Sequence, residues 1–120
     1  MANRTGPTNP VLIKLIMDLK KKGSEENVNL WRRIASELER STRTRRAVNL
    51  LRINRYTKEN ETIIVPGKVL GSGDIDHNIT VAAYQFSEGA VDKINKKGKA
   101  ISITELMKEN PKGTNVRIIG

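Results

Sequence analysis

The sequence predicts a mixed α and β fold, with two helices in the first 40 residues and short strands and helices after them. Apolar residues recur at helical spacing in the first part of the chain. In the second part, short apolar stretches alternate with turn-forming Gly, Pro, Asn and Asp residues. The 120 residues suit one folded unit with its own core, so we expect a single domain over residues 1–120.

The first helix is predicted over residues 10–22. Asn9 can cap it, and Pro10 suits its first position because a proline lacks the N–H that would stay unpaired there. Its apolar residues spread over so much of the helix surface that we expect it to be covered on two sides; they are Val11, Leu12, Ile13, Leu15, Ile16, Met17 and Leu19. Gly23 is predicted to end the helix.

A second helix is predicted from about Val28 to Arg40. Its apolar positions form one face and are Leu30, Trp31, Ile34, Ala35 and Leu38. We expect Trp31 to be buried between this helix and the sheet, because it shares that face with Ile34 and Leu38.

An arginine-rich segment occupies residues 40–58. It contains no acidic residue and seven basic ones, which are Arg40, Arg43, Arg45, Arg46, Arg52, Arg55 and Lys58. Residues 40–46 have no apolar side chain, so we expect them to be mobile in the free protein, as we do the polar tail of residues 1–8. Residues 47–53 are predicted as a short strand or a buried extended segment.

The second half reads as alternating strands and helices. Strands are predicted at 62–65, where Pro66-Gly67 ends the strand, and at 68–70, 79–84, 100–103 and 116–119. Helices are predicted at 88–97, between a Ser87 cap and Gly98, and at 105–109, where Ser102-x-x-Glu105 resembles a capping box. The strands that flank the helix at 88–97 should be parallel.

Charge and composition narrow the classes of function. The net charge is +9, and residues 1–60 hold 14 basic and 6 acidic side chains, so a polyanion is the expected partner. The chain has no Cys and one His, which leaves no basis for a cysteine nucleophile or a structural metal site. Its apolar runs are far shorter than the ~20 residues needed to span a membrane, and we expect a cytoplasmic protein. Four aromatic residues are too few for an extended base-stacking platform.

Three possible sites fail on their spacing. The segment from Gly67 to Asp74 does not match a phosphate-binding or dinucleotide-binding glycine pattern, and its glycines are interpreted as turn residues. Asp74, Asp76 and Asn78 lack the glycine and the closing Glu of a calcium loop. His77 has no positioned nucleophile near it in the sequence and is predicted to be an exposed loop residue. We therefore predict no catalytic residue, metal, cofactor or small-molecule substrate.

The arginine-rich segment is the main candidate for nucleic-acid contact, because the planar guanidinium grips phosphate oxygens in pairs. Its seven basic residues are predicted to bind phosphates, followed by a second group from charge alone, which is Arg4, Lys20, Lys21, Lys22, Arg32, Arg33 and Lys112. Lys93, Lys96, Lys97 and Lys99 surround the end of a predicted helix, and the helix dipole explains most of that cluster.

The alternatives are a DNA-binding regulator and a small enzyme. The two N-terminal helices imitate a helix-turn-helix, but Glu25 and Glu26 between them would repel phosphate. An enzyme would need a pocket of titrating groups, and the sequence offers none.

The chain resembles the archaeal and eukaryotic eighteen-e family of the large ribosomal subunit, which is related to the bacterial-type large-subunit protein fifteen. The residues that support the resemblance are Asn9-Pro10, Leu30-Trp31-Arg32-Arg33-Ile34-Ala35, Ile53-Asn54-Arg55, Val65-Pro66-Gly67-Lys68-Val69-Leu70-Gly71, Thr80-Val81-Ala82-Ala83, Phe86-Ser87, Asn110-Pro111-Lys112-Gly113 and Asn115-Val116-Arg117-Ile118-Ile119. They extend over nearly the whole chain, and its lack of eukaryotic extensions resembles an archaeal member.

The resemblance implies an α+β fold in which two N-terminal helices precede an irregular superhelix of strand-strand-helix turns. It implies a place in the large subunit, contacts with ribosomal RNA and neighbouring ribosomal proteins, and no catalytic step. Lys68 and Arg117 lie in the matched motifs and join the predicted RNA contacts. We expect the free protein to be a monomer that binds no membrane.

Overall fold

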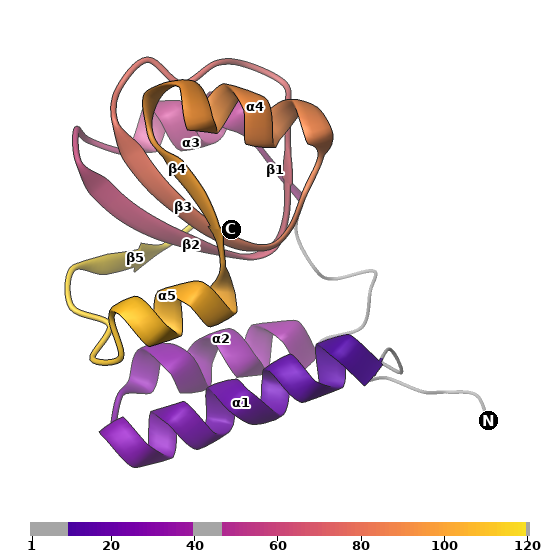
Figure 1. The fold of residues 1–120 in the computed structure, drawn as a ribbon, viewed down its shortest axis with the longest axis vertical. Coiled ribbons are helices and arrows are strands. Elements are labelled where there is room, and N and C mark those ends of the chain that lie inside the picture. Colours follow the sequence, from indigo (N-terminus) through magenta and orange to yellow (C-terminus); the bar gives the residue numbers. More distant parts are fainter. Residues whose placement is uncertain (1–9, 40–46, 120) are drawn as a thin grey trace.

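The computed structural model describes residues 10–39 and 47–119 (Figure 1). The predicted tail of residues 1–8 lies outside the described residues, and so do residues 40–46 of the arginine-rich segment. The described part of the chain forms five helices and five strands in the order α1, α2, β1, α3, β2, β3, α4, β4, α5 and β5. The predicted α+β class is confirmed, with two N-terminal helices followed by strand-helix units.

Helices α1 (Pro10–Glu26) and α2 (Asn29–Glu39) pack against each other at one end of the molecule (Figure 1). The predicted helix end at Gly23 is wrong, because Gly23 is buried inside α1. A Cβ atom at Gly23 would lie 2.8 Å from Cγ of Arg32, so the absence of a side chain lets the two helices approach closely. The helix ends instead at Glu26, and the next residue, Asn27, has a φ of 57°, in the left-handed region that terminates many helices.

Helix α1 buries only one face. Leu12, Ile16 and Leu19 are buried, whereas Val11 is 72% exposed and Met17 is 64% exposed. The prediction that α1 is covered on two sides is therefore wrong for the described part of the chain. The apolar residues of α1 cover more of the helix surface than the part that packs against the rest of the protein. The residues that pack are those at helical spacing.

The sheet consists of β1 (Ala47–Asn49), β2 (Glu61–Leu70), β3 (Ile79–Phe86), β4 (Lys99–Ser102) and β5 (Val116–Ile118). Its order is β1-β2-β3-β4, β5 pairs with β2, and every pairing is parallel. The predicted parallel arrangement of the strands around α4 is thus confirmed. A wholly parallel sheet needs cover on both faces, which the helices supply.

Strand β2 runs through Pro66 and Gly67, where the sequence predicts a turn. The predicted strand end at Val65 is wrong, because the chain stays extended to Leu70 and both Pro66 and Gly67 are buried. The register of β2 against β3 shifts between Val65 and Lys68. Such an irregularity accommodates a proline, which cannot donate a hydrogen bond to a neighbouring strand.

The secondary structure of residues 47–53 also differs from the prediction. Only Ala47–Asn49 is a strand, and Leu50–Tyr56 forms helix α3. Leu50 and Ile53 are three residues apart and both are buried, which is helical spacing. In so short an apolar run, periodicity does not distinguish a strand from a helix.

The predicted caps of the last two helices are confirmed. Helix α4 spans Glu88–Lys97, and the Ser87 side chain accepts a hydrogen bond from the Ala90 amide. Helix α5 spans Ile103–Glu109, where Ser102 and Glu105 form the predicted capping box. Each cap satisfies amide groups that have no partner inside the helix.

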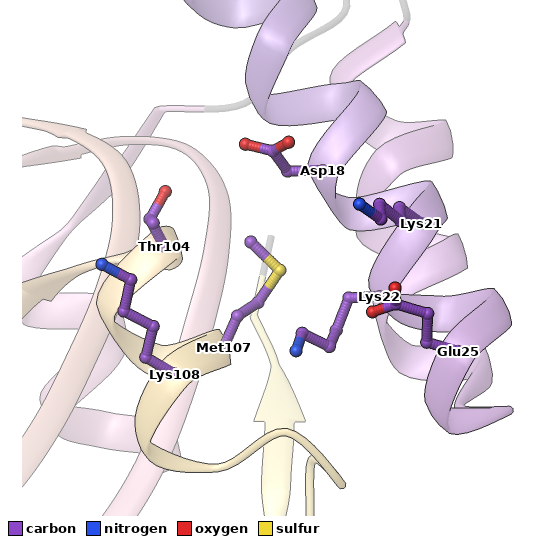
Figure 2. A pocket seen from close by; sticks show the side chains of 7 residues that line it. All are labelled: Asp18, Lys21, Lys22, Glu25, Thr104, Met107 and Lys108. Atoms are coloured by element: carbon purple, nitrogen blue, oxygen red, sulfur yellow. The ribbon is translucent and has the colours of Figure 1, made fainter.

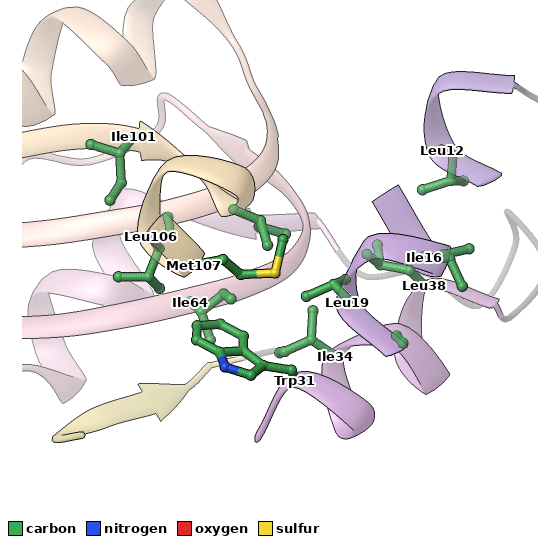
Figure 3. Close-up of a cluster of buried hydrophobic side chains, with 13 residues drawn as sticks. Leu12, Ile16, Leu19, Trp31, Ile34, Leu38, Ile64, Ile101, Leu106 and Met107 are labelled. Carbon is green, nitrogen blue, oxygen red and sulfur yellow. The ribbon is translucent and has the colours of Figure 1, made fainter. Parts of the chain in front are cut away.

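Two hydrophobic clusters lie on the two faces of the sheet. One cluster joins α1, α2 and α5 to Ile64 and Ala82, and the other joins α3 and α4 to Ile63 and Val81. Neighbouring residues of a strand point to opposite faces, which separates the two sets. Figure 3 shows Trp31 in the first cluster between α2 and Ile64; it is fully buried, as predicted.

Candidate nucleic-acid interface

Helix α3 and the turn after it present three exposed cations. Arg52, Arg55 and Lys58, which we call the α3 basic cluster, are at least partly exposed, while Leu50 and Ile53 anchor the opposite side of the helix in the core. No carboxylate of the described residues lies within ion-pair distance of these three side chains. The cluster is thus available for an external anion.

The glycine-rich loop after β2 holds the first turn of α3. The Leu51 amide donates a 3.0 Å hydrogen bond to the Ser72 carbonyl, and Lys93 Nζ donates to the carbonyls of Gly71 at 2.9 Å and Gly73 at 2.8 Å. Gly73 has a φ of 96°, and a Cβ atom there would lie 2.6 Å from the Leu51 amide nitrogen. These glycines are turn residues, as predicted, and they connect α3 to α4.

His77 fastens the same loop to the end of α3. Its side chain is 13% exposed, so the prediction of a solvent-exposed histidine is wrong. Nδ1 lies 2.9 Å from Asp76 Oδ1, and Nε2 lies 2.7 Å from Thr57 Oγ1. The Thr57 hydroxyl also donates to the Ile53 carbonyl at 2.8 Å.

The contacts of His77 with Asp76 and Thr57 hold the end of α3. The hydrogen bond from His77, with a further contribution from Asn54, lowers the pKa of Asp76 below its ordinary value.

Arg117 of β5 braces the last turn of α3 from the other side. Its Nε donates to Glu61 Oε2 at 2.7 Å and its Nη2 to Glu61 Oε1 at 3.1 Å, while Nη2 also donates to the Tyr56 carbonyl. Burial alone would raise the pKa of Glu61. Hydrogen bonds from the Lys58 amide and from Arg117, together with the positive charges of the Arg117 and Lys58 side chains, instead lower this pKa below its ordinary value of 4.5. Arg117, predicted as a phosphate contact, already has a carboxylate partner.

Replacing Glu61 by Gln should lower stability at neutral pH by about 1 kcal/mol, because a partly exposed charged pair contributes little more than that. A carboxyl group with a lowered pKa stabilises the fold above its unfolded pKa, and this contribution is lost as the pH falls through the lower folded pKa. The variant should therefore lose less stability than the wild type between pH 7 and pH 3. Urea unfolding at both pH values measures this, with Glu25→Gln as a control at an exposed glutamate. Parallel pH profiles for wild type and Glu61→Gln would contradict the brace.

The other predicted cations within the described residues lie on α1, on α2, on β2 and in the turn after α5, and not on α3. Lys20 pairs with Glu39 at 2.6 Å and Lys112 with Glu26 at 3.0 Å, whereas Arg32 bonds to the Asn29 side chain at 2.7 Å. Among these predicted cations, those that are at least partly exposed and have no ion pair within the described ranges are Lys21, Lys22, Arg32, Arg33 and Lys68. Arg4, Arg40, Arg43, Arg45 and Arg46 lie outside the described residues.

Figure 2 shows a pocket of about 260 Å³ between α1 and α5, lined by Lys21 and Lys22 among others. Asp18 and Glu25 also line it, so its charge is mixed. The predicted lysines of α1 therefore have acidic neighbours, and Lys58 likewise lies near Glu59 and Glu61. Among residues 10–39 and 47–119 there is no group of three His, Asp or Glu side chains placed to hold a metal ion, nor a helix with the length and hydropathy to cross a membrane.

Tyr56 is the residue of this surface that the sequence analysis missed. The Arg52 guanidinium carbon lies 5.2 Å from the centre of its ring, and the ring itself is exposed. The four-residue spacing of Arg52 and Tyr56 is a helical signal, but the interpretation of this stretch as extended hides it.

A small, strongly basic α+β protein that presents arginines on an exposed helix has the features of a nucleic-acid-binding class. A profile of ribosomal proteins, whose description includes the large-subunit proteins 50S-L15 and 50S-L18e, matches residues 27–102, and the chain belongs to that family. The match extends from the end of α1 to the end of β4 and includes the α3 basic cluster.

Curated archaeal relatives named large ribosomal subunit protein eL18 are similar over the whole chain. The chain is 48% identical to the protein of Methanothermobacter thermautotrophicus, 49% to that of Methanospirillum hungatei and 50% to that of Methanosphaerula palustris. Each comparison covers 120 residues and 99% of both chains. The resemblance noted from the sequence motifs is confirmed, and membership of this family indicates a structural, non-enzymatic protein.

Proposed function

We propose that this chain is a structural constituent of the large subunit of the cytoplasmic ribosome, and that it binds ribosomal RNA chiefly through the arginine-rich segment of residues 40–58. The observation that supports the binding mode most directly is the α3 basic cluster, which reaches solvent and forms no ion pair within the described part of the chain. Arg40, Arg43, Arg45 and Arg46 precede it in the sequence and extend the same charge.

The fixing of α3 at both ends supports the proposal. The loop after β2 holds the first turn through Leu51, and Arg117 and His77 hold the last turn. Side chains on a helix that is already held lose less freedom on binding than side chains on a mobile loop. Arg52 and Arg55 therefore meet phosphates from a preorganised surface, whereas Lys20, Lys112 and Arg117 must first leave a partner within the chain.

The other partners are proposed only as a class of molecule. Other proteins of the large subunit are the expected neighbours, and we propose that the free protein is a monomer without a small-molecule substrate. The two buried clusters support this, because each is closed by helices of the same chain.

The experiment compares two double variants by the salt dependence of binding to large-subunit ribosomal RNA. Removing one phosphate-binding cation should reduce the slope of log K against log salt by about 0.9 on a duplex, by analogy with DNA, so Arg55→Ala with Lys58→Ala should reduce it by roughly two units. Lys96→Ala with Lys97→Ala is the matched control at an exposed helix end and should reduce it less. Lys93 is left unchanged, because it holds the glycine-rich loop.

Two results would contradict the proposal. Equal slope changes from the two double variants would mean that binding follows total charge and not this surface. Equal affinity for duplex DNA and for ribosomal RNA would favour the DNA-binding alternative instead. A triple replacement of Arg43, Arg45 and Arg46 by Ala tests the preceding part of the segment, and it too should lower the slope by roughly two units.

A further inference from the structure

Tyr56 differs from the other aromatic residues of the chain in its exposure. The structure describes all four of them: Trp31 is buried, Tyr84 and Phe86 are partly buried, and Tyr56 is 52% exposed. A single exposed aromatic is ordinary on a protein surface, so its exposure alone assigns no role. Its surroundings are what indicate one.

Helical geometry places Tyr56 among the cations of the α3 basic cluster. Residues three and four apart share a helix face, so Arg52 stands beside both Arg55 and Tyr56. The Arg52 guanidinium carbon lies over the ring at 5.2 Å from its centre, yet half of the tyrosine remains in solvent. The surface thus presents a π-face next to cations.

The backbone of Tyr56 is held on two sides. Its carbonyl accepts a hydrogen bond from Arg117, and the next residue, Thr57, is bonded to both His77 and the Ile53 carbonyl. The ring therefore projects from a fixed position at the end of α3. A fixed aromatic side chain loses little conformational entropy when it binds a flat partner.

The positive charge of this surface indicates which class of molecule with a planar group it binds. A peptide partner would need carboxylates to match three cations, whereas one nucleotide supplies both a phosphate and an aromatic base. Bases inside a duplex are stacked on each other and have no free face, so the base in question must be unpaired.

We propose that the Tyr56 ring stacks on one unpaired base of ribosomal RNA, while Arg52, Arg55 and Lys58 bind the phosphates beside that base. This inference rests on the proposed function and adds to it, because phosphate contacts alone do not distinguish a paired from an unpaired site. It is compatible with the small number of aromatic residues, since it needs one stacking residue and not an extended platform.

The test uses two RNA probes, a fully paired duplex and the same duplex with one bulged 2-aminopurine, whose fluorescence reports stacking. The wild-type protein should bind the bulged probe more tightly and change its fluorescence. Tyr56→Leu should weaken binding to the bulged probe by roughly 5- to 150-fold, the effect of losing one base stack, and leave the duplex affinity nearly unchanged. Tyr56→Phe keeps the ring and should behave as the wild type.

Salt dependence separates stacking from charge. Tyr56→Leu removes no charge and should leave the salt slope on the bulged probe unchanged, whereas Arg55→Ala should reduce it by about 0.7–0.9. Equal losses on both probes, or no loss in Tyr56→Leu, would overturn the stacking proposal while the ribosomal RNA-binding function stands. Failure of the wild type to bind either probe, with no salt-dependent binding to ribosomal RNA, would overturn both proposals. Circular dichroism of each variant confirms that α3 and the fold are retained.

Discussion

Replacing Trp31 by alanine should lower the free energy of unfolding by about 3–5 kcal/mol, enough to unfold much of a marginally stable domain. The Trp31 side chain is fully buried in the cluster that joins α2 to the sheet. Its indole N–H also donates a 2.8 Å hydrogen bond to the Pro111 carbonyl, 80 residues away. The alanine variant therefore gives up a large apolar surface, leaves a cavity and removes the partner of a carbonyl that fixes the C-terminal turn. Urea unfolding followed by circular dichroism measures the loss.

Trp31→Phe separates the two contributions, because phenylalanine keeps most of the apolar packing and lacks the N–H. We expect it to cost about 1–3 kcal/mol, less than the alanine variant. A loss below about 1 kcal/mol in Trp31→Ala would contradict the described packing. So would a water-like emission maximum of this single tryptophan in the folded wild-type protein.

Replacing Gly98 by alanine should cost about 3 kcal/mol or more, although it adds a single methyl group. Gly98 follows α4, and its amide donates a 2.7 Å hydrogen bond to the Ile94 carbonyl. A Cβ atom at this position would overlap the Ile79 carbonyl oxygen and lie 2.8 Å from the Ile79 nitrogen. Both atoms belong to the backbone of β3, so the end of α4 and the start of that strand would have to separate.

Gly89→Ala is the matched control within the same helix. A Cβ atom at Gly89 meets nothing within 4 Å, and the residue is exposed in the first turn of α4. Alanine is a better helix former than glycine, so this variant should gain about 0.5–1 kcal/mol of stability. Thermal unfolding of the two variants should thus shift in opposite directions. A Gly98→Ala protein as stable as the wild type would show that Ile79 and Gly98 are not in contact.

Elements with local signals were predictable from the sequence. Ser87 and Gly98 correctly bounded α4, and Ser102 with Glu105 predicted the cap of α5, because capping depends on residues within one turn of each other. Glycine and proline gave wrong predictions of helix and strand ends where tertiary contacts decided the local structure. Gly23 continues α1 because Arg32 packs against it, and Pro66 lies inside β2 because a register shift removes the need for its missing N–H.

The charge of the candidate site was predictable from the sequence, whereas the arrangement of its residues was not. The arginine-rich segment is visible as seven cations without an acid, but residues 47–53 are too few to show a helical period. The spacing of Arg52 and Tyr56 was therefore not recognised as helical, and the bond between His77 and Thr57 could not be read from the sequence, because it joins residues 20 apart at the end of α3. Nor could it show that Arg117 has a carboxylate partner 56 residues away.

The sequence by itself determined the class of this protein: a basic α+β domain with an arginine-rich segment and motifs similar to those of a ribosomal family. Composition, charge runs and caps are properties of neighbouring residues, so they can be read without coordinates. The tertiary structure alone decided which cations are available and which are paired, because an ion pair such as Arg117 with Glu61 joins residues that only folding brings together. Folding likewise buried one face of α3 in the core and thereby left Arg52, Arg55 and Tyr56 on the solvent side.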